Sequence, residues 1–202
     1  MNPIEEIHDR FNNPRRARIL ASRVAELLPR DAAVLDVGTG DGRIATLVAE
    51  RRPDVTIRGI EVFPRERTSI PVERFDGSLI PFGDASFDAV TFVDVLHHAE
   101  DPVLLLREGA RVARRALVIK DHTREGFLAR PTLRFMDWVG NRRHGIAVPD
   151  DYWTESHWLR TFEELGLRAS VWERKLELYP RFLGWIFDRG LHCLARLDLP
   201  GR

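Results

Sequence analysis

Residues 33–50 constrain the fold of this chain more than any other stretch. Ala33–Val37 is a short apolar strand carrying one acid, Asp36, and glycines follow at positions 38, 40 and 42. The next residues, 43–50, have their apolar side chains at helical spacing. Strand, glycine-rich turn and helix in this order form the nucleotide site of an open α/β sheet, because glycine adopts positive φ and lets a ligand lie against the main chain. The segment therefore predicts a doubly wound α/β fold.

The spacing of the glycines indicates which ligand the turn binds. A dinucleotide site has the pattern G-x-G-x-x-G, whereas this turn has G-x-G-x-G, with Asp36 before it and Asp41 inside it. Two carboxylates would repel a pyrophosphate, but they suit a ligand that carries hydroxyls and a positive charge. A nicotinamide-dependent oxidoreductase is therefore disfavoured.

Asp36–Gly42 resembles the first motif of class I S-adenosylmethionine-dependent methyltransferases, a strand that ends in D-x-G-x-G-x-G. The resemblance implies S-adenosylmethionine as the cofactor and places Asp36, Gly38, Thr39 and Gly40 in its site. It also implies a Rossmann-like, mostly parallel sheet of seven strands with an antiparallel edge strand.

A further acid follows the next expected strand, residues 55–61. Glu61 lies about twenty residues beyond the glycine turn, where an acid at the end of the second strand can accept hydrogen bonds from both ribose hydroxyls. Residues 62–71 have prolines near both ends and few apolar residues. We therefore expect a short turn where such a fold usually has its second crossover helix.

Residues 75–88 resemble methyltransferases of the ubiquinone/menaquinone C-methyltransferase type, which have an acid, a small residue, L-P-F and then S-F-D in a similar run. In that group the acid accepts a hydrogen bond from the adenine amino group and the next backbone N–H meets a ring nitrogen. Here these roles fall on Asp76 and Gly77. Residues 94–102 are similar to the motif that follows the fourth strand of the same enzymes. The resemblance gives three further cofactor contacts: Val62, Asp94 and Val95.

The remaining segments complete a single domain of helices and strands. Helices are expected at residues 4–28, 102–114, 128–141 and 154–165, and strands at 33–37, 55–61, 72–75, 88–94, 116–122, 168–178 and 191–197. The last two strands are expected to pair as an antiparallel hairpin at the sheet edge. The domain divides into an N-terminal helical segment (1–30), a cofactor-binding core (31–122) and an acceptor side (123–202). Residues 7–11 are either a lid over the cofactor or a loosely held turn.

Composition favours a soluble cytoplasmic protein. The chain has 202 residues, 44% of them hydrophobic, and no apolar run near twenty residues, so no membrane span is expected. The one cysteine forms no internal disulfide, and no Cys/His spacing predicts a metal site. The formal net charge of zero argues against an arginine-rich surface for RNA, and DNA is not expected as a partner. A monomer or a homodimer is expected.

Histidines and an acid after the fourth and fifth strands are the catalytic candidates. His97 and His98 follow the fourth strand, and Asp121 and His122 end the fifth. If the methyl acceptor is a hydroxyl, a general base assists by about 10²–10⁴-fold. His122, Asp121 and His97 are the predicted catalytic residues, although a packing role for the paired histidines is equally open. Further residues are expected to cover the acceptor pocket or to pack near it: Trp138, Asn141, Asp150, Tyr152, His157, Tyr179, Phe182, Trp185 and Phe187.

The sequence predicts methyl transfer from S-adenosylmethionine to a small-molecule acceptor. A hydroxyl oxygen or a carbon of an aromatic or lipid-like metabolite is preferred, because the acceptor side is rich in Trp and Phe. Two alternatives stay open: an inactive cofactor-binding scaffold or regulatory subunit, and a methyltransferase acting on RNA or protein.

Overall fold

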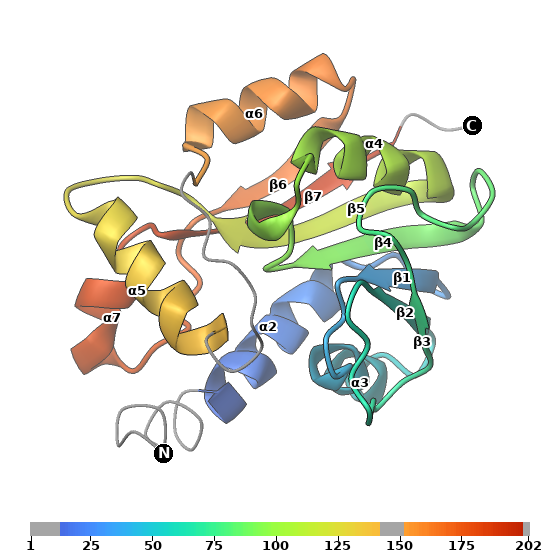
Figure 1. The fold of residues 1–202 in the computed structure, drawn as a ribbon, viewed down its shortest axis with the longest axis horizontal. Coiled ribbons are helices and arrows are strands. Elements are labelled where there is room, and N and C mark those ends of the chain that lie inside the picture. Colours follow the sequence, from blue (N-terminus) through green and yellow to red (C-terminus); the bar gives the residue numbers. More distant parts are fainter. Residues whose placement is uncertain (1–12, 142–151, 200–202) are drawn as a thin grey trace.

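The computed structural model, which describes residues 13–141 and 152–199, contains a seven-stranded sheet in the order β3-β2-β1-β4-β5-β7-β6 (Figure 1). Strands β1 to β5 are parallel, and β7 runs antiparallel to both β5 and β6. The strands are β1 Ala33–Val37, β2 Thr56–Glu61, β3 Val72–Arg74, β4 Phe87–Val93, β5 Ala113–His122, β6 Arg168–Glu173 and β7 His192–Asp198. The predicted fold class, including the antiparallel final pair, is confirmed.

Helices cover both faces of the sheet. On one face α4 and α6 pack against the strands, and α2 and α3 lie on the other (Figure 1). Successive strand residues alternate between the two cores, so that Leu35 joins the α4–α6 side and Val34 the α2–α3 side. The helices are α2 Asn13–Leu27, α3 Arg43–Arg51, α4 Pro102–Val112, α5 Ala129–Asn141, α6 Glu155–Glu164 and α7 Arg181–Phe187, with a 3₁₀ turn, η2, at Leu96–His98.

Helix starts follow the local chemistry that the sequence offers. The Asp101 side chain accepts a hydrogen bond from the backbone N–H of Leu104 at 2.9 Å, and Pro102 stands in the first turn of α4. Thr154 caps α6 in the same way, accepting from the N–H of His157. Between β2 and β3 the described chain forms bends and irregular backbone and no helix, as the prolines predict.

The expected strand at 168–178 is wrong in its second half, because β6 ends at Glu173. Beyond Glu173 the alternating residues are buried without strand pairing. The N–H of Leu178 donates to the Asp188 side chain, and its C=O accepts from Arg15 of α2. Leu176 and Leu178 are buried in the α2–α3 core, and this explains the alternation of apolar and polar residues that predicted a strand.

Two other expectations concern the ends of the chain and the membrane. The proposed lid, residues 7–11, and the first part of the expected N-terminal helix lie outside the described residues. Within the described ranges, every helix is too short or too polar to cross a lipid bilayer.

Candidate active site

The glycine turn after β1 lies at the carboxyl edge of the parallel strands, where open α/β sheets bind their ligands. Gly38 and Gly40 have φ values of 69° and 61°. A Cβ at Gly38 would stand 2.4 Å from Cγ2 of Val95, whereas one at Gly40 would meet nothing within 4 Å. The turn is thus closed against Val95 on one side and open above Gly40 on the other, which leaves main chain accessible to a ligand.

Two carboxylates hold this turn in place. Asp36 is buried and accepts hydrogen bonds from the hydroxyls of Thr39 (2.6 Å) and Thr91 (2.5 Å). Burial raises the pKa of Asp36, although these two hydrogen bonds act against the shift. Glu61 accepts from the N–H of Gly40 through Oε2 and from the N–H of Val62 through Oε1, each at 2.9 Å. Glu61 therefore sits between the glycine turn and the end of β2.

Asp76 and Gly77 shape the next turn along this edge. Oδ1 of Asp76 accepts from the N–H of Ser78 (2.8 Å), its hydroxyl (2.9 Å) and the N–H of Leu79 (2.8 Å), and these bonds, those from Ser78 first, lower the pKa of Asp76. Gly77 has a φ of 90°, and a Cβ there would lie 3.2 Å from Cγ2 of Val62. We call the glycine turn, Glu61 and Asp76–Gly77 the cofactor edge.

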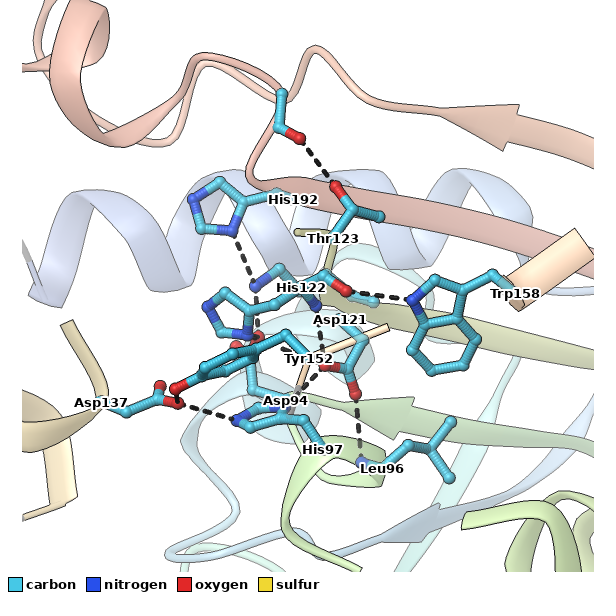
Figure 2. A network of polar contacts seen from close by, with 12 residues as sticks. Asp94, Leu96, His97, Asp121, His122, Thr123, Asp137, Tyr152, Trp158 and His192 are labelled. Atoms are coloured by element: carbon cyan, nitrogen blue, oxygen red, sulfur yellow. Dashed lines mark hydrogen bonds and ion pairs between the residues drawn. The ribbon is translucent and has the colours of Figure 1, made fainter. Parts of the chain in front are cut away.

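His97 and Asp121 form a buried pair beside this edge (Figure 2). Nδ1 of His97, in η2, lies 2.5 Å from Oδ1 of Asp121 at the end of β5, and their side chains are 4% and 0% exposed. The Asp121 carboxylate also accepts from the N–H groups of Leu96 (3.0 Å) and His122 (2.7 Å). Strands β4 and β5 are adjacent, so η2, which follows β4, lies beside the end of β5. This arrangement holds His97 against Asp121, and we call the two residues the His97–Asp121 dyad.

The second nitrogen of His97 faces helix α5. Nε2 lies 3.7 Å from Oδ2 of Asp137, and this carboxylate accepts a hydrogen bond from the hydroxyl of the buried Tyr152. Figure 2 shows the resulting sequence of groups, from Tyr152 through Asp137 and His97 to Asp121. We call these residues, together with His122, the histidine cluster.

Asp137 is a residue that the sequence interpretation missed. It lies four positions after Leu133 on α5, and both side chains are buried. An acid on the apolar face of a predicted helix was the available signal, because a buried carboxylate requires a partner.

The two buried histidines of the cluster differ in the direction of their pKa shifts. Burial by itself would lower the pKa of His97, but Asp121 and then Asp137 raise it above the ordinary value. Burial lowers the pKa of His122, and Lys120 adds to that shift. Asp121 and Asp137 therefore make His97 the more basic of the two histidines, whereas burial and Lys120 make His122 less basic.

Residues 8–170 match the protein family described as a methyltransferase domain. The chain belongs to this methyltransferase family. The resemblance to class I enzymes is thereby confirmed, and with it S-adenosylmethionine as the cofactor.

Curated relatives match this methyltransferase over part of their length. A stretch of 110 residues is 34% identical to the 27-O-demethylrifamycin SV methyltransferase of Amycolatopsis mediterranei, covering 47% of this chain and 40% of that protein. Another of 69 residues is 41% identical to the demethylmenaquinone methyltransferase of Deinococcus radiodurans, covering 29% of each. The chain therefore spans less than half the length of these relatives.

Solved structures share the fold of this methyltransferase. A chain from the complex between the Haloferax volcanii Trm112 methyltransferase activator and a methyltransferase superposes with a TM-score of 0.69. The identity is 15%, and 99% of each chain is covered, so the likeness concerns the fold alone.

The cofactor edge of the methyltransferase fits S-adenosylmethionine. The open main chain over Gly40 gives room for a ligand, and Glu61 beside it presents a carboxylate at the position expected for ribose hydroxyls. Phe63, which is 71% exposed, offers a flat apolar face next to Glu61. The individual cofactor contacts, including those of Val62 and Val95, stay predictions.

Asp94 occupies a different environment from the other predicted cofactor contacts. Its carboxylate forms ion pairs with Arg16 of α2 and Lys120 of β5, and Lys120 in turn lies 3.4 Å from Nδ1 of the buried His192. Burial would raise the pKa of Asp94, but Arg16 and Lys120 hold it well below the ordinary value. A cofactor contact by Asp94 stays a prediction, and its carboxylate already ties α2 to the end of β5.

The cluster also contains groups that could hold a metal ion. Ligand atoms of His97, Asp121 and His122 lie within 4.8 Å of one another, and so do those of His97, His98 and Asp137. Spacing along the sequence predicted no metal centre, and it could not report on side chains that β5, η2 and α5 bring together.

The other acceptor-side candidates do not gather around a single site. Trp138 on α5 and Trp185 on α7 are 43% and 73% exposed, whereas Tyr152 is buried in the cluster. His157 is exposed on α6, with its ring 4.4 Å from that of Trp153. Tyr179 and Phe187 have their rings 5.3 Å apart, Phe182 belongs to α7, Asn141 ends α5, and Asp150 lies outside the described residues.

Proposed function

We propose that this methyltransferase methylates a small-molecule acceptor at a hydroxyl oxygen, or at a carbon activated by that hydroxyl, with His97 as the general base. The observation that carries the proposal is the 2.5 Å contact between Nδ1 of His97 and Oδ1 of Asp121. It commits Nδ1 to the carboxylate, so Nε2, which faces Asp137 at 3.7 Å, is the atom that would receive the proton of the acceptor.

S-adenosylmethionine, when bound, supplies a methyl group already activated by a sulfonium. The protein therefore has to position the acceptor, exclude water and remove one proton. The carbon–sulfur bond breaks with its electron pair staying on sulfur, the new bond forms to the acceptor, and the hydroxyl proton goes to Nε2 of His97. Asp121 stabilises the resulting imidazolium, as its effect on the pKa of His97 indicates.

His97 replaces His122 as the favoured base. The Nδ1 atom of His122 is buried without a hydrogen-bond partner among the described residues, and it lies 3.7 Å from both Asp94 and Asp121. The C=O of His122 accepts from the indole N–H of Trp158 at 3.0 Å, so its backbone is fixed by α6. We infer a packing or acceptor-contacting role for His122.

A small acceptor is favoured over RNA or protein by the enclosure of the cluster. The side chain of His97 is 4% exposed, and Tyr152 and α5 lie over it. The names of the relatives from A. mediterranei and D. radiodurans refer to a demethylrifamycin and a demethylmenaquinone, which supports a small-molecule acceptor. A cytoplasmic monomer or homodimer remains our expectation for this chain.

Methyl transfer from labelled S-adenosylmethionine tests the proposal. The protein is incubated with separate phenol, naphthoquinol and alcohol acceptors and with a fractionated metabolite extract, and the labelled product is examined by mass spectrometry and NMR. We expect the label on a hydroxyl oxygen or on the neighbouring ring carbon. Label on nitrogen, or transfer to RNA or protein alone, would overturn the proposal.

Calorimetry with S-adenosylhomocysteine, together with the transfer assay, distinguishes an active enzyme from an inactive scaffold. Both hypotheses predict micromolar binding of this compound, whereas the scaffold predicts no transfer to any acceptor or extract fraction. Binding of NAD in place of S-adenosylhomocysteine would contradict both.

A further inference from the structure

Helix α5 carries different chemistry on its two sides. The buried side presents Leu133 and Asp137, the latter toward His97. On the other side Phe135 and Trp138 are 45% and 43% exposed, and their rings stack at 6.4 Å. Exposed aromatic side chains this close together, on a helix that also contributes to the active site, are more than scattered surface residues.

The apolar surface extends beyond α5. Phe127, just before the helix, is 83% exposed, and Leu128 is 53% exposed. Trp185 of α7 is 73% exposed. The two helices lie side by side in Figure 1, and the guanidinium of Arg189 after α7 donates to the hydroxyl of Thr132 in α5 at 3.1 Å. We call the exposed side chains of residues 127–138 and 181–189 the α5–α7 surface.

The exposed charges of the α5–α7 surface are all of one sign. Its exposed ionic side chains are arginines: Arg130, Arg134, Arg181 and Arg189. Within these two described ranges the acids point elsewhere. Asp137 is buried in the histidine cluster, and Asp188 accepts hydrogen bonds from the N–H groups of Leu178 and Tyr179. The chain as a whole has a formal net charge of zero, so the surplus of arginine is local.

We propose that the α5–α7 surface docks this methyltransferase on an anionic lipid bilayer. Aromatic side chains bury themselves at the level of the lipid headgroups, and arginines beside them pair with headgroup phosphates. A second copy of this chain fits less well, because a twofold contact would place this arginine surface against itself. The proposal concerns attachment to the membrane surface and goes beyond the proposed reaction.

Docking in this way would place α5 between the lipid and the histidine cluster. Asp137 and Tyr152 cover Nε2 of His97 from the side of α5. An acceptor dissolved in the bilayer would then reach the dyad past a helix that already contacts the membrane.

Sedimentation with vesicles tests the proposal without any acceptor. The full chain is mixed with vesicles of phosphatidylcholine and with vesicles that also contain phosphatidylglycerol. We expect binding to the anionic vesicles, weakened by added salt because the attraction is screened. Failure to bind anionic vesicles at low salt would overturn the proposal and leave the proposed reaction untouched.

Two pairs of variants locate the surface. Phe127→Ala with Trp185→Ala removes its most exposed aromatic side chains, and Arg130→Glu with Arg181→Glu reverses its charge. We expect each pair to weaken vesicle binding by about tenfold or more. The matched controls lie on α6, where Leu159→Ala and Arg160→Glu change exposed residues of similar kind and should leave binding unchanged.

Three results would contradict this docking surface. Equal loss of vesicle binding in the α6 controls would show nonspecific adsorption. Full binding by both α5–α7 pairs would place the contact elsewhere. A dimer in gel filtration without lipid, lost with Trp185→Ala, would show that a second copy occupies the surface. Circular dichroism of each variant, with S-adenosylhomocysteine binding, verifies that the fold is retained.

Discussion

The cofactor edge and the histidine cluster lie at the ends of the same parallel strands, but they are built differently. The cofactor edge is mostly local backbone, in which Asp36 accepts from Thr39 three residues on and Asp76 accepts from Ser78 two residues on. In the histidine cluster, side chains from η2, β5 and α5 meet, so its geometry depends on how distant elements pack. Under the proposed function, the first region holds the methyl donor and the second contacts the acceptor.

The largest expected effect is the loss of turnover when the histidine cluster is changed and the cofactor edge is left intact. His97→Gln removes the proposed base and retains a polar side chain of similar size. We expect turnover to fall by about 10²–10⁴-fold, the usual contribution of a general base, with the affinity for S-adenosylhomocysteine unchanged. Single-turnover transfer of labelled methyl and calorimetry measure the two quantities. His157→Gln on the exposed side of α6 is the control, and equal turnover in both variants would remove His97 from the mechanism.

A change at Glu61 is expected to weaken cofactor binding, in contrast to a change at His97. Glu61→Gln keeps the shape of the side chain but removes the charge that the predicted ribose contacts use. Hydrogen bonds to a charged group contribute about 1.5–3 kcal/mol each, so binding of S-adenosylhomocysteine should weaken by roughly 10–100-fold.

Glu73→Gln on β3 serves as the control for Glu61→Gln, because the Glu73 side chain is 50% exposed and pairs with Arg58 at the surface. Unchanged calorimetric affinity in Glu61→Gln would show that the cofactor edge lies elsewhere along the sheet.

The same contrast explains what the sequence could predict. The strand–turn–helix order, the acids at strand ends and the turn in place of the second crossover helix were all predictable, because each depends on neighbouring residues or on the alignment of parallel strand ends. The cluster was predicted as a set of candidates without its pairing. Which nitrogen of His97 meets Asp121 depends on the register of β4 beside β5 and on the conformation of η2.

Long-range ion pairs lay beyond prediction for a different reason. Arg16 and Asp94 are 78 positions apart, and the place of Asp94 after β4 predicts a cofactor contact without indicating the ion pair with Arg16. Nothing local in the sequence indicates which arginine an acid at a strand end will meet. The same holds for Asp137, whose partners are η2 and Tyr152.

A smaller effect is expected in the pH dependence of turnover. His97 acts as a base when neutral, so the rate should rise as the pH passes through its pKa. Burial lowers this pKa, but Asp121 and Asp137 outweigh burial and raise it above the ordinary value. Asp137→Asn removes one of the stabilising charges. We therefore expect the rising limb to move to lower pH, with little change in turnover on the alkaline plateau.

The Asp137→Asn profile has a matched control in Asp84→Asn. The Asp84 side chain is 69% exposed and pairs with Arg111, and Asp84 precedes β4 whereas η2 follows that strand. If the rising limb of the pH–rate profile lies at the same pH in the Asp137→Asn variant and in the native protein, the group that titrates in catalysis is not His97.

The smallest expected effect is that of metal removal, and the reason lies in the charge of the cluster. The carboxylates at and beside the cluster already face partners: Asp121 and Asp137 face the two ring nitrogens of His97, and Asp94 pairs with Arg16 and Lys120. A divalent cation at either trio would have to displace these contacts of His97. We therefore expect dialysis against EDTA to leave turnover unchanged and added Mg²⁺, Mn²⁺ or Zn²⁺ not to raise it. Activation by one cation that is lost in His98→Gln would instead assign the His97–His98–Asp137 trio as a metal centre, and it would turn the proposed base into a ligand.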